Sequence, residues 1–251
     1  MKRVAVIPAR YASSRFPAKP LAMLKGKPMV MWVYDAVCQS ELFDIVIIAT
    51  DDERIKNCAE SYGANVRMTS TEFTCGTQRC EFVLSELERE GVEVELVVNV
   101  QGDEPLISKT QLSDLLNLFD AKNCEIATLA KEINDIEELT SANCVKVVKS
   151  NNKAIYFSRS VIPHLRGYRI NEYLEHHTYY KHIGLYGYKA DVLHEIVKME
   201  PSSLEIAESL EQLRWLENGY TISIGETDFE SIGVDTPEDL DRVNKILDKN
   251  I

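Results

Sequence analysis

Several familiar signatures are missing from this 251-residue sequence. It has no GxxxxGK[ST] loop, and no GxGxxG follows its first apolar run, which argues against a P-loop nucleotidase and a dinucleotide-dependent oxidoreductase. No apolar run approaches the roughly 18 residues of a membrane-spanning helix. The run Val4–Ile7 ends at Pro8 and is too short for the core of a secretory signal. We therefore expect neither a membrane segment nor a signal peptide.

Paired cysteine motifs are also absent. None of the six cysteines forms a CxxC pair or has the spacing of a zinc finger. Most lie in apolar stretches, which predicts reduced cysteines in the core and a cytoplasmic protein.

Acidic residues are missing from the first 34 positions, which carry seven Lys and Arg. The whole chain is acidic, with 28 basic and 40 acidic side chains and a net charge of −12. Such a chain is a poor candidate for binding nucleic acid or a membrane. A basic segment on an acidic body indicates either a local site for a small anion or a chance surface cluster.

Short apolar runs alternate with helical patterns along the chain. This alternation predicts an α/β fold with a mostly parallel sheet and helices on both faces. We expect a single domain over 1–251, with an antiparallel excursion at about 155–190. The predicted strands cover 3–8, 44–50, 95–101, 125–132, 144–149 and 220–225, and the predicted helices cover 28–39, 52–62, 77–90, 108–120, 189–198, 203–217 and a last segment from 236.

Three cations lie between the first strand and the following helix, at Arg10, Arg15 and Lys19. Ligands of such sheets bind at the carboxyl ends of the strands. Backbone N–H groups and cations in this loop are suited to a polyphosphate. A solvated basic loop remains the alternative.

Two aspartates follow apolar runs and precede helices, Asp103 in NVQGDEP and Asp235 in GVDTPEDL. Carboxylates there are well placed to hold Mg²⁺ against a phosphate. The same positions are also typical of helix caps.

Other polar groups have a functional and a structural interpretation. Gly76–Arg79 starts a helix and either contacts a base or ribose or caps that helix. Arg159 pairs either with a substrate carboxylate or with a surface acid. His182 has a site role or a structural one, and Glu211 and Gln212 bind sugar hydroxyls or form a solvated helix face.

Together these segments resemble the 3-deoxy-manno-octulosonate cytidylyltransferases over nearly the whole chain. The matching blocks are IPARYASSRFPAKPL (7–21), GKPM (26–29), ATDDERI (49–55), NVQGDEP (99–105), VKVV (145–148), YFSR (156–159), HIGLYGY (182–188), LEQLR (210–214) and GVDTPEDL (233–240). The resemblance implies a Rossmann-like, three-layer nucleotidyltransferase fold. It also implies that CTP and the eight-carbon sugar acid Kdo give a CMP-sugar and pyrophosphate, for lipopolysaccharide biosynthesis. A homodimer with the 155–190 region in its interface is implied as well.

The resemblance assigns a role to each candidate residue. Arg10, Lys19, Asp103 and Asp235 are the implied catalytic group, and the two aspartates are the implied Mg²⁺ ligands. The implied CTP residues are Pro8, Ala9, Arg10, Arg15, Lys19, Gly76 and Arg79, and the implied sugar-acid residues are Gln101, Arg159, His182, Tyr186, Glu211 and Gln212.

Two segments depart from the family pattern. Where the family reads close to His-x-Ser-Gly-Thr-Asp/Glu-Arg, this chain has Phe73-Thr74-Cys75-Gly76-Thr77-Gln78-Arg79, and His164-Leu165-Arg166 is also unusual. The departures leave open a variant substrate, either the 8-amino-8-deoxy analogue of Kdo or a sialic acid.

Overall fold

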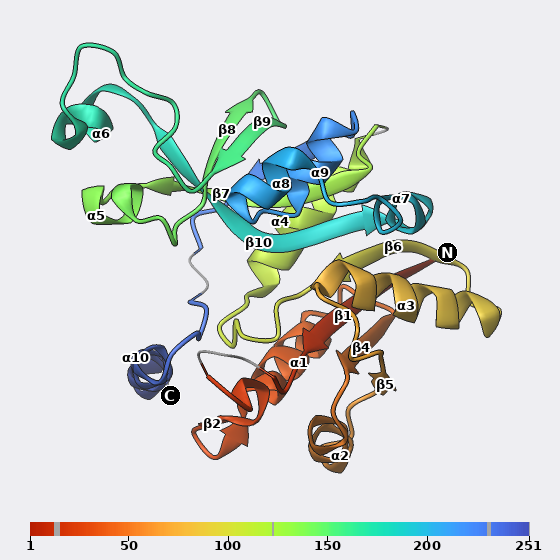
Figure 1. Ribbon diagram of the computed structural model, residues 1–251. Helices are drawn as coiled ribbons and strands as arrows, with labels where there is room; N and C mark the ends of the chain where they lie inside the picture. The colour runs from red at the N-terminus through yellow and green to blue at the C-terminus, as the bar shows by residue number, and fades with distance from the viewer. Residues whose placement is uncertain (13–15, 122, 230–231, 251) are drawn as a thin grey trace. The chain divides into compact units, whose positions relative to one another are not determined.

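The computed structural model describes residues 1–12, 16–121, 123–229 and 232–250. The chain forms two compact units (Figure 1). Unit 1 contains residues 1–113, 188–197 and 231–251, and unit 2 contains 114–187 and 198–230. Among the described residues, no helix is both long and apolar enough to cross a membrane.

Unit 1 is built on parallel strands in the order β5-β4-β1-β6. Helices α1, α2, α3 and α7 pack against this sheet, and a two-stranded ribbon, β2–β3, precedes α1. The elements are β1 (Lys2–Ala9), η1 (Lys19–Leu21), β2 (Met23–Leu24), β3 (Lys27–Pro28), α1 (Met29–Ser40), β4 (Ile45–Thr50), α2 (Glu53–Ser61), β5 (Val66–Met68), α3 (Gly76–Arg89), β6 (Val94–Asn99), α4 (Lys109–Asn117, which continues into unit 2), α7 (Ala190–Ile196) and α10 (Pro237–Asn250).

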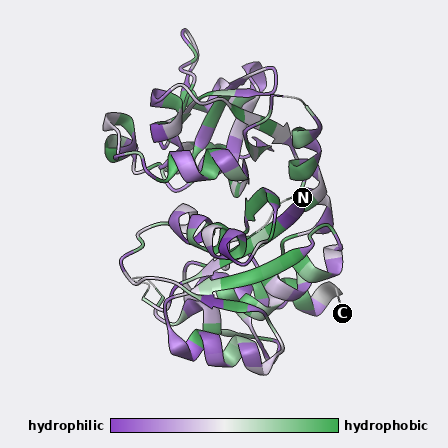
Figure 2. Ribbon diagram, turned by 90° about the vertical axis from the view of Figure 1, so that its right-hand side faces the viewer, coloured by the Kyte–Doolittle hydropathy of each residue, from purple (hydrophilic) through white to green (hydrophobic). Residues whose placement is uncertain are grey.

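The central strands are apolar on both faces. Val4, Ala5, Val6 and Ile7 in β1 are all fully buried, as expected for a parallel strand covered on both sides. Burying one such Val or Ile side chain stabilises the fold by about 1.5–3 kcal/mol. The helices are instead amphipathic, and their ribbons carry hydrophilic and hydrophobic residues in turn (Figure 2). Burial therefore explains why the first strand could be predicted from its continuous apolar run.

Unit 2 combines parallel and antiparallel strands in the order β10-β7-β11-β9-β8. β7 and β11 are parallel, whereas β8 pairs antiparallel with β9 and β10, and β9 pairs antiparallel with β11. These pairings are the predicted antiparallel excursion, so the fold class is confirmed. The elements are η2 (Leu118–Asp120), β7 (Ile126–Ile133), α5 (Ile136–Thr140), β8 (Lys146–Ser150), β9 (Lys153–Ser158), η3 (Ile170–Glu172), α6 (Tyr173–His176), β10 (Tyr179–Lys189), α8 (Ser203–Glu208), α9 (Gln212–Glu217) and β11 (Ile222–Glu226).

One predicted helix is wrong. The single helix expected over 203–217 is interrupted at Ser209, whose φ of 53° lies in the left-handed region. This conformation ends α8, because a right-handed helix cannot continue through it. Glu211 and Gln212 consequently lie at the start of the short helix α9 and not inside a long amphipathic one.

The expectation of core cysteines holds for only part of the set. Cys80 and Cys124 are buried, whereas Cys38 is exposed and Cys58, Cys75 and Cys144 are half-buried. All six are free thiols.

Candidate functional site

Unit 1 contains a pocket of about 530 Å³ at the carboxyl ends of β1 and β6. This is the edge of a parallel sheet where ligands bind. Nine predicted site residues line it, namely Pro8, Ala9, Arg10, Lys19, Gly76, Arg79, Gln101, Asp103 and Asp235. Gln101, implied to contact the sugar acid, therefore shares a pocket with the implied CTP residues. Arg15 lies outside the described residues.

Two glycines let the pocket walls approach closely. A Cβ added at Gly102 would lie 2.6 Å from the carbonyl oxygen of Pro8, which is backbone and has little freedom to move. A Cβ at Gly76 would lie 2.9 Å from the side-chain nitrogen of Asn99. Glycine at these positions allows the ends of β1, β6 and α3 to meet around the pocket.

Lys19 forms ion pairs with both candidate metal ligands, Asp103 and Asp235. Its Nζ lies 2.5 Å from Asp103 Oδ2 and 3.0 Å from Asp235 Oδ1. Burial lowers the pKa of Lys19, but the two carboxylates outweigh this effect, so its pKa is raised. Lys19 therefore remains a cation that offsets the negative charge of both aspartates.

The capping alternative for the aspartates is not supported. Asp239 accepts hydrogen bonds from the backbone N–H of Asp235 and Thr236 at 3.1 and 3.0 Å, and Thr236 Oγ1 accepts from the Asp239 N–H. Thr236 and Asp239 thus form the reciprocal cap of α10. The carboxylate of Asp103 instead bonds Lys19.

Mg²⁺ fits the chemistry of this pair of carboxylates. Mg²⁺ takes oxygen ligands and is usually held by one or two carboxylates together with waters and substrate phosphates. Within the described part of the chain, no group of three or more His, Cys, Asp or Glu side chains has the arrangement of a metal site. The two aspartates therefore suit a metal that completes its coordination with phosphate oxygens.

Arg79 is fully buried and has one nitrogen without a partner. Its NH2 group donates to Asp51 Oδ2 at 2.7 Å, and NH1 donates to Thr69. Among the described residues, its Nε has no hydrogen-bond partner, and neither has Oδ1 of Asn99. Buried polar atoms in native proteins are nearly always paired, so these two atoms are exceptions to the usual pattern.

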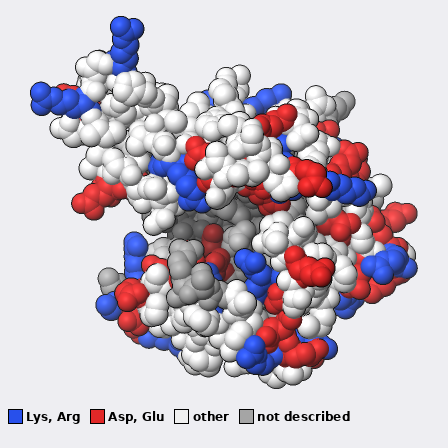
Figure 3. All heavy atoms as spheres, in the orientation of Figure 1, with Lys and Arg blue, Asp and Glu red and all other residues white. Residues whose placement is uncertain are grey.

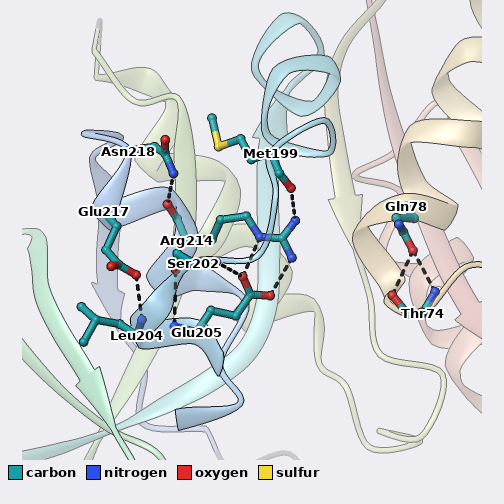
Figure 4. Close-up of polar contacts among 9 residues, drawn as sticks. All are labelled: Thr74, Gln78, Met199, Ser202, Leu204, Glu205, Arg214, Glu217 and Asn218. Atoms are coloured by element: carbon teal, nitrogen blue, oxygen red, sulfur yellow. Dashed lines mark hydrogen bonds and ion pairs between the residues drawn. The ribbon is translucent and has the colours of Figure 1, made fainter. Parts of the chain in front are cut away.

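The segment that departs from the family pattern shapes one wall of this pocket. Oε1 of Gln78 accepts a 2.8 Å bond from the backbone N–H of Thr74, with the Thr74 hydroxyl at 3.3 Å (Figure 4). The carbonyl of Thr74 in turn accepts a 3.2 Å bond from Arg10. An amide oxygen accepts hydrogen bonds as a carboxylate oxygen does. Gln78 can therefore bind Thr74 without the negative charge of the Asp or Glu in the family pattern.

The basic N-terminal segment divides into two groups. Lys2, Lys25 and Lys27 pair with Asp44, Asp248 and Asp35, as in the mixed surface charges of Figure 3. Arg10 and Lys19 line the pocket. The surface interpretation therefore holds for the first group, and the anion-binding interpretation stays a prediction for the second.

The candidate residues of unit 2 lie around an aromatic cluster. The ring centroids of His182 and Tyr186 are 5.2 Å apart, and His182 meets Phe157 edge-on at 5.1 Å. Burial lowers the pKa of His182 to about 3. Burial also raises the pKa of Tyr186, and the charge of Glu211 raises it further. These pKa shifts keep His182 and Tyr186 neutral near pH 7.

Thr128 contacts His182 and was missed by sequence reasoning. Its Oγ1 lies 2.9 Å from the carbonyls of Ile183 and Leu185 and 3.2 Å from His182 Nε2. When the single hydroxyl proton is donated to a carbonyl, the oxygen can accept a hydrogen bond from Nε2–H. Nδ1 is then the acceptor atom of this imidazole.

Arg159 lies in the same unit and binds backbone carbonyls. Its guanidinium donates to Glu208 at 2.8 Å, Ala142 at 3.1 Å and Ser209 at 3.4 Å. It forms no salt bridge within the described residues, so the surface ion pair is not supported. Gln212 is buried, and its Nε2 has no hydrogen-bond partner in the described part of the chain.

Comparison with known proteins supports the resemblance seen in the sequence. A family profile described as "Cytidylyltransferase" matches residues 4–226. The chain is 49% identical to the 3-deoxy-manno-octulosonate cytidylyltransferase of Parabacteroides distasonis and 51% identical to that of Phocaeicola vulgatus, with 98% of each chain covered. It also matches the structure of a CMP:2-keto-3-deoxy-manno-octonic acid synthetase complexed with CTP. That match has a TM-score of 0.89 and 37% identity over the full length of both chains.

Proposed function

The chain belongs to the cytidylyltransferase family, and we propose that it couples CTP to a 3-deoxy-manno-octulosonate-type sugar acid, giving a CMP-sugar and pyrophosphate. The observation that carries this proposal is the pocket of unit 1, where Lys19 joins two carboxylates and buried Arg79 has an unpartnered Nε. The two carboxylates with Lys19 suit a phosphate–metal centre. The Nε donor of Arg79 suits a nucleobase. The product would serve lipopolysaccharide biosynthesis.

The reaction brings two anions together, so neutralising charge is its main requirement. The anomeric hydroxyl of the sugar acid attacks the α-phosphorus of CTP in line and loses its proton to water, the bond between the α-phosphorus and the β-phosphate oxygen breaks, and pyrophosphate leaves. Arg10, Lys19 and Arg15 stabilise the negative charge that develops on pyrophosphate. Arg79 and Gly76 hold the cytidine part.

Asp103 and Asp235 would hold the Mg²⁺ that this chemistry uses. A metal held there would polarise a phosphoryl oxygen and lower the pKa of the attacking hydroxyl. Lys19 holds both carboxylates in one place and carries positive charge toward the same pocket.

We expect Asp103→Asn and Asp235→Asn to lose at least about 100-fold in pyrophosphate release, since each removes a charged oxygen ligand. Binding of Mn²⁺, a spectroscopic substitute for Mg²⁺, should weaken in parallel when measured by electron paramagnetic resonance with CTP present. Asp44→Asn, which removes an exposed carboxylate outside the pocket, serves as the control. Near-normal turnover and Mn²⁺ binding in both pocket variants would contradict the metal assignment.

The sugar acid would be recognised by polar groups of unit 2. Arg159 supplies donors for the carboxylate, His182 an acceptor at Nδ1 and Gln212 a donor at Nε2. Tyr186 and Glu211 complete this set. Neutral imidazole and phenol groups suit hydroxyl groups of a sugar, because they bind them without adding charge.

The substrate itself is tested by a panel of acceptors. Purified protein is incubated with CTP, Mg²⁺ and one of three acids: Kdo, its 8-amino-8-deoxy analogue or a sialic acid. We expect kcat/KM to be highest for Kdo, with the CMP-sugar identified by mass. A preference for the amino analogue would assign the altered 73–79 segment to a variant activity, and turnover of none would overturn the proposal.

We also propose a homodimer in the cytoplasm. Three large apolar side chains are exposed in the 155–190 region that the family resemblance implies to be the interface, at Ile155, Tyr168 and Ile170. A second copy of the chain is their proposed partner. The six free thiols are consistent with a reducing compartment.

A further inference from the structure

A fully buried lysine lies next to the candidate carboxylate-binding arginine. The side chain of Lys146 in β8 has no exposed surface, and its Nζ donates to the carbonyls of Ser141 at 2.8 Å, Cys144 at 2.6 Å and Arg159 at 2.6 Å. An ammonium has three N–H donors, so these carbonyls satisfy all of them. Because burying a charge is costly, a buried lysine that pairs with no acidic side chain among the described residues requires a reason.

The main chain of Arg159 is held on both sides by charged groups. Its carbonyl accepts from Lys146, and its N–H donates to Glu208 Oε2 at 3.0 Å. Glu208 is itself fixed by a 2.6 Å bond from the Ser158 hydroxyl. Burial raises the pKa of Glu208, but these hydrogen bonds outweigh it and lower the pKa. Glu208 is therefore ionised near pH 7.

The side chain of Arg159 depends on the same loop. NH1 donates to the carbonyl of Ala142, which lies between the two loop residues that Lys146 binds. Nε and NH2 donate to the carbonyls of Glu208 and Ser209. Of the five N–H groups of arginine, these bonds use three. Within the described residues, one N–H on each terminal nitrogen forms no hydrogen bond, and two such donors can bind a carboxylate.

We infer that Lys146 and Glu208 are positioning residues, which hold the guanidinium of Arg159 in the orientation that binds the carboxylate of the sugar acid. This inference rests on the proposed function of Arg159. Holding a flexible side chain before the substrate arrives avoids an entropy cost at binding. A small misplacement of such a group is costly for the reaction.

Lys146→Met tests this role, because it keeps the length of the side chain and removes its donors. We expect the KM for the sugar acid to rise by about 10- to 100-fold, with the KM for CTP and kcat changed by less than about twofold. Lys149→Met in the same strand is the matched control, since its ammonium binds Glu226 and not the Arg159 segment. That control should leave the KM for the sugar acid unchanged.

A double-mutant cycle separates positioning from a general loss of structure. In the Arg159→Ala background, Lys146→Met should cause no further rise in KM, because the group that it positions is gone. Glu208→Gln gives a second, milder variant should Lys146→Met fail to fold, and the same non-additivity is expected of it.

The outcomes distinguish the inference from the function on which it rests. If Arg159→Ala leaves the KM for the sugar acid unchanged, the role of Arg159 is wrong. If Arg159→Ala raises this KM but Lys146→Met and Glu208→Gln do not, the positioning role is overturned. Equal effects with and without Arg159 would also overturn it.

Discussion

His182 is the residue whose surroundings change its acid–base behaviour most clearly. Burial lowers its pKa to about 3, compared with about 6.5 for a free histidine. The unfolded chain takes up a proton at this residue below pH 6.5, whereas the folded chain does so only near pH 3. Folding stability therefore falls as the pH drops through this window, and the contribution is fully present above pH 6.5.

His182→Gln should reduce this loss of stability. Between pH 7 and pH 5, we expect the free energy of unfolding of the variant to fall by about 2 kcal/mol less than that of the original chain. Urea unfolding at the two pH values measures the difference. The same change at exposed His176 controls for the removal of a histidine. An identical acid sensitivity in both chains would show that His182 is protonated in the folded state.

Residue types in the pocket could be predicted from sequence, but their partners could not. Lys19 and Asp235 lie 216 positions apart, and both were expected in one site because each follows a strand or precedes a helix at the same sheet edge. Asn99 gave no such signal, since its amide is buried beneath Gly76. Lys146 lies in the VKVV block, yet only the structure shows the three carbonyls around it.

At the level of elements, continuous apolar runs predicted strands correctly, whereas the break between two short helices was not predicted. Apolar runs predicted β1 and β4 to within a residue or two of their bounds, because burial on both faces leaves a continuous signal. The break between α8 and α9 occurs at Ser209, which adopts a left-handed conformation. The conformational preference of serine does not predict this break.

The α8–α9 pair has its own polar framework. Glu205 reaches back to the N–H of Ser202 and also pairs with Arg214 of α9 at 2.6 Å, while Arg214 donates to the carbonyl of Met199 (Figure 4). A bidentate pair of this kind fixes relative orientation as well as adding energy. The framework holds the 208–212 segment, which carries the Arg159 contacts and the predicted sugar residues Glu211 and Gln212.

At the level of the whole molecule, the proposed dimer depends on exposed apolar side chains. Isolated exposed apolar residues are ordinary on a protein surface, so exposure alone does not identify an interface. The discriminating feature is location, because Ile155, Tyr168 and Ile170 all fall within the 155–190 region that the family resemblance implies to be the interface.

Placing a charge at one of these positions distinguishes a dimer interface from ordinary exposed apolar residues. Ile155→Asp should convert a dimer to a monomer at micromolar concentration, since a carboxylate buried in an interface without a partner is strongly unfavourable. Sedimentation equilibrium measures the molecular mass. Ile206→Asp is the matched control, because this isoleucine is 69% exposed compared with 56% for Ile155 but lies outside the region. If the starting chain is a monomer, the dimer proposal is wrong, and if both variants dissociate equally, the interface is not confined to the 155–190 region.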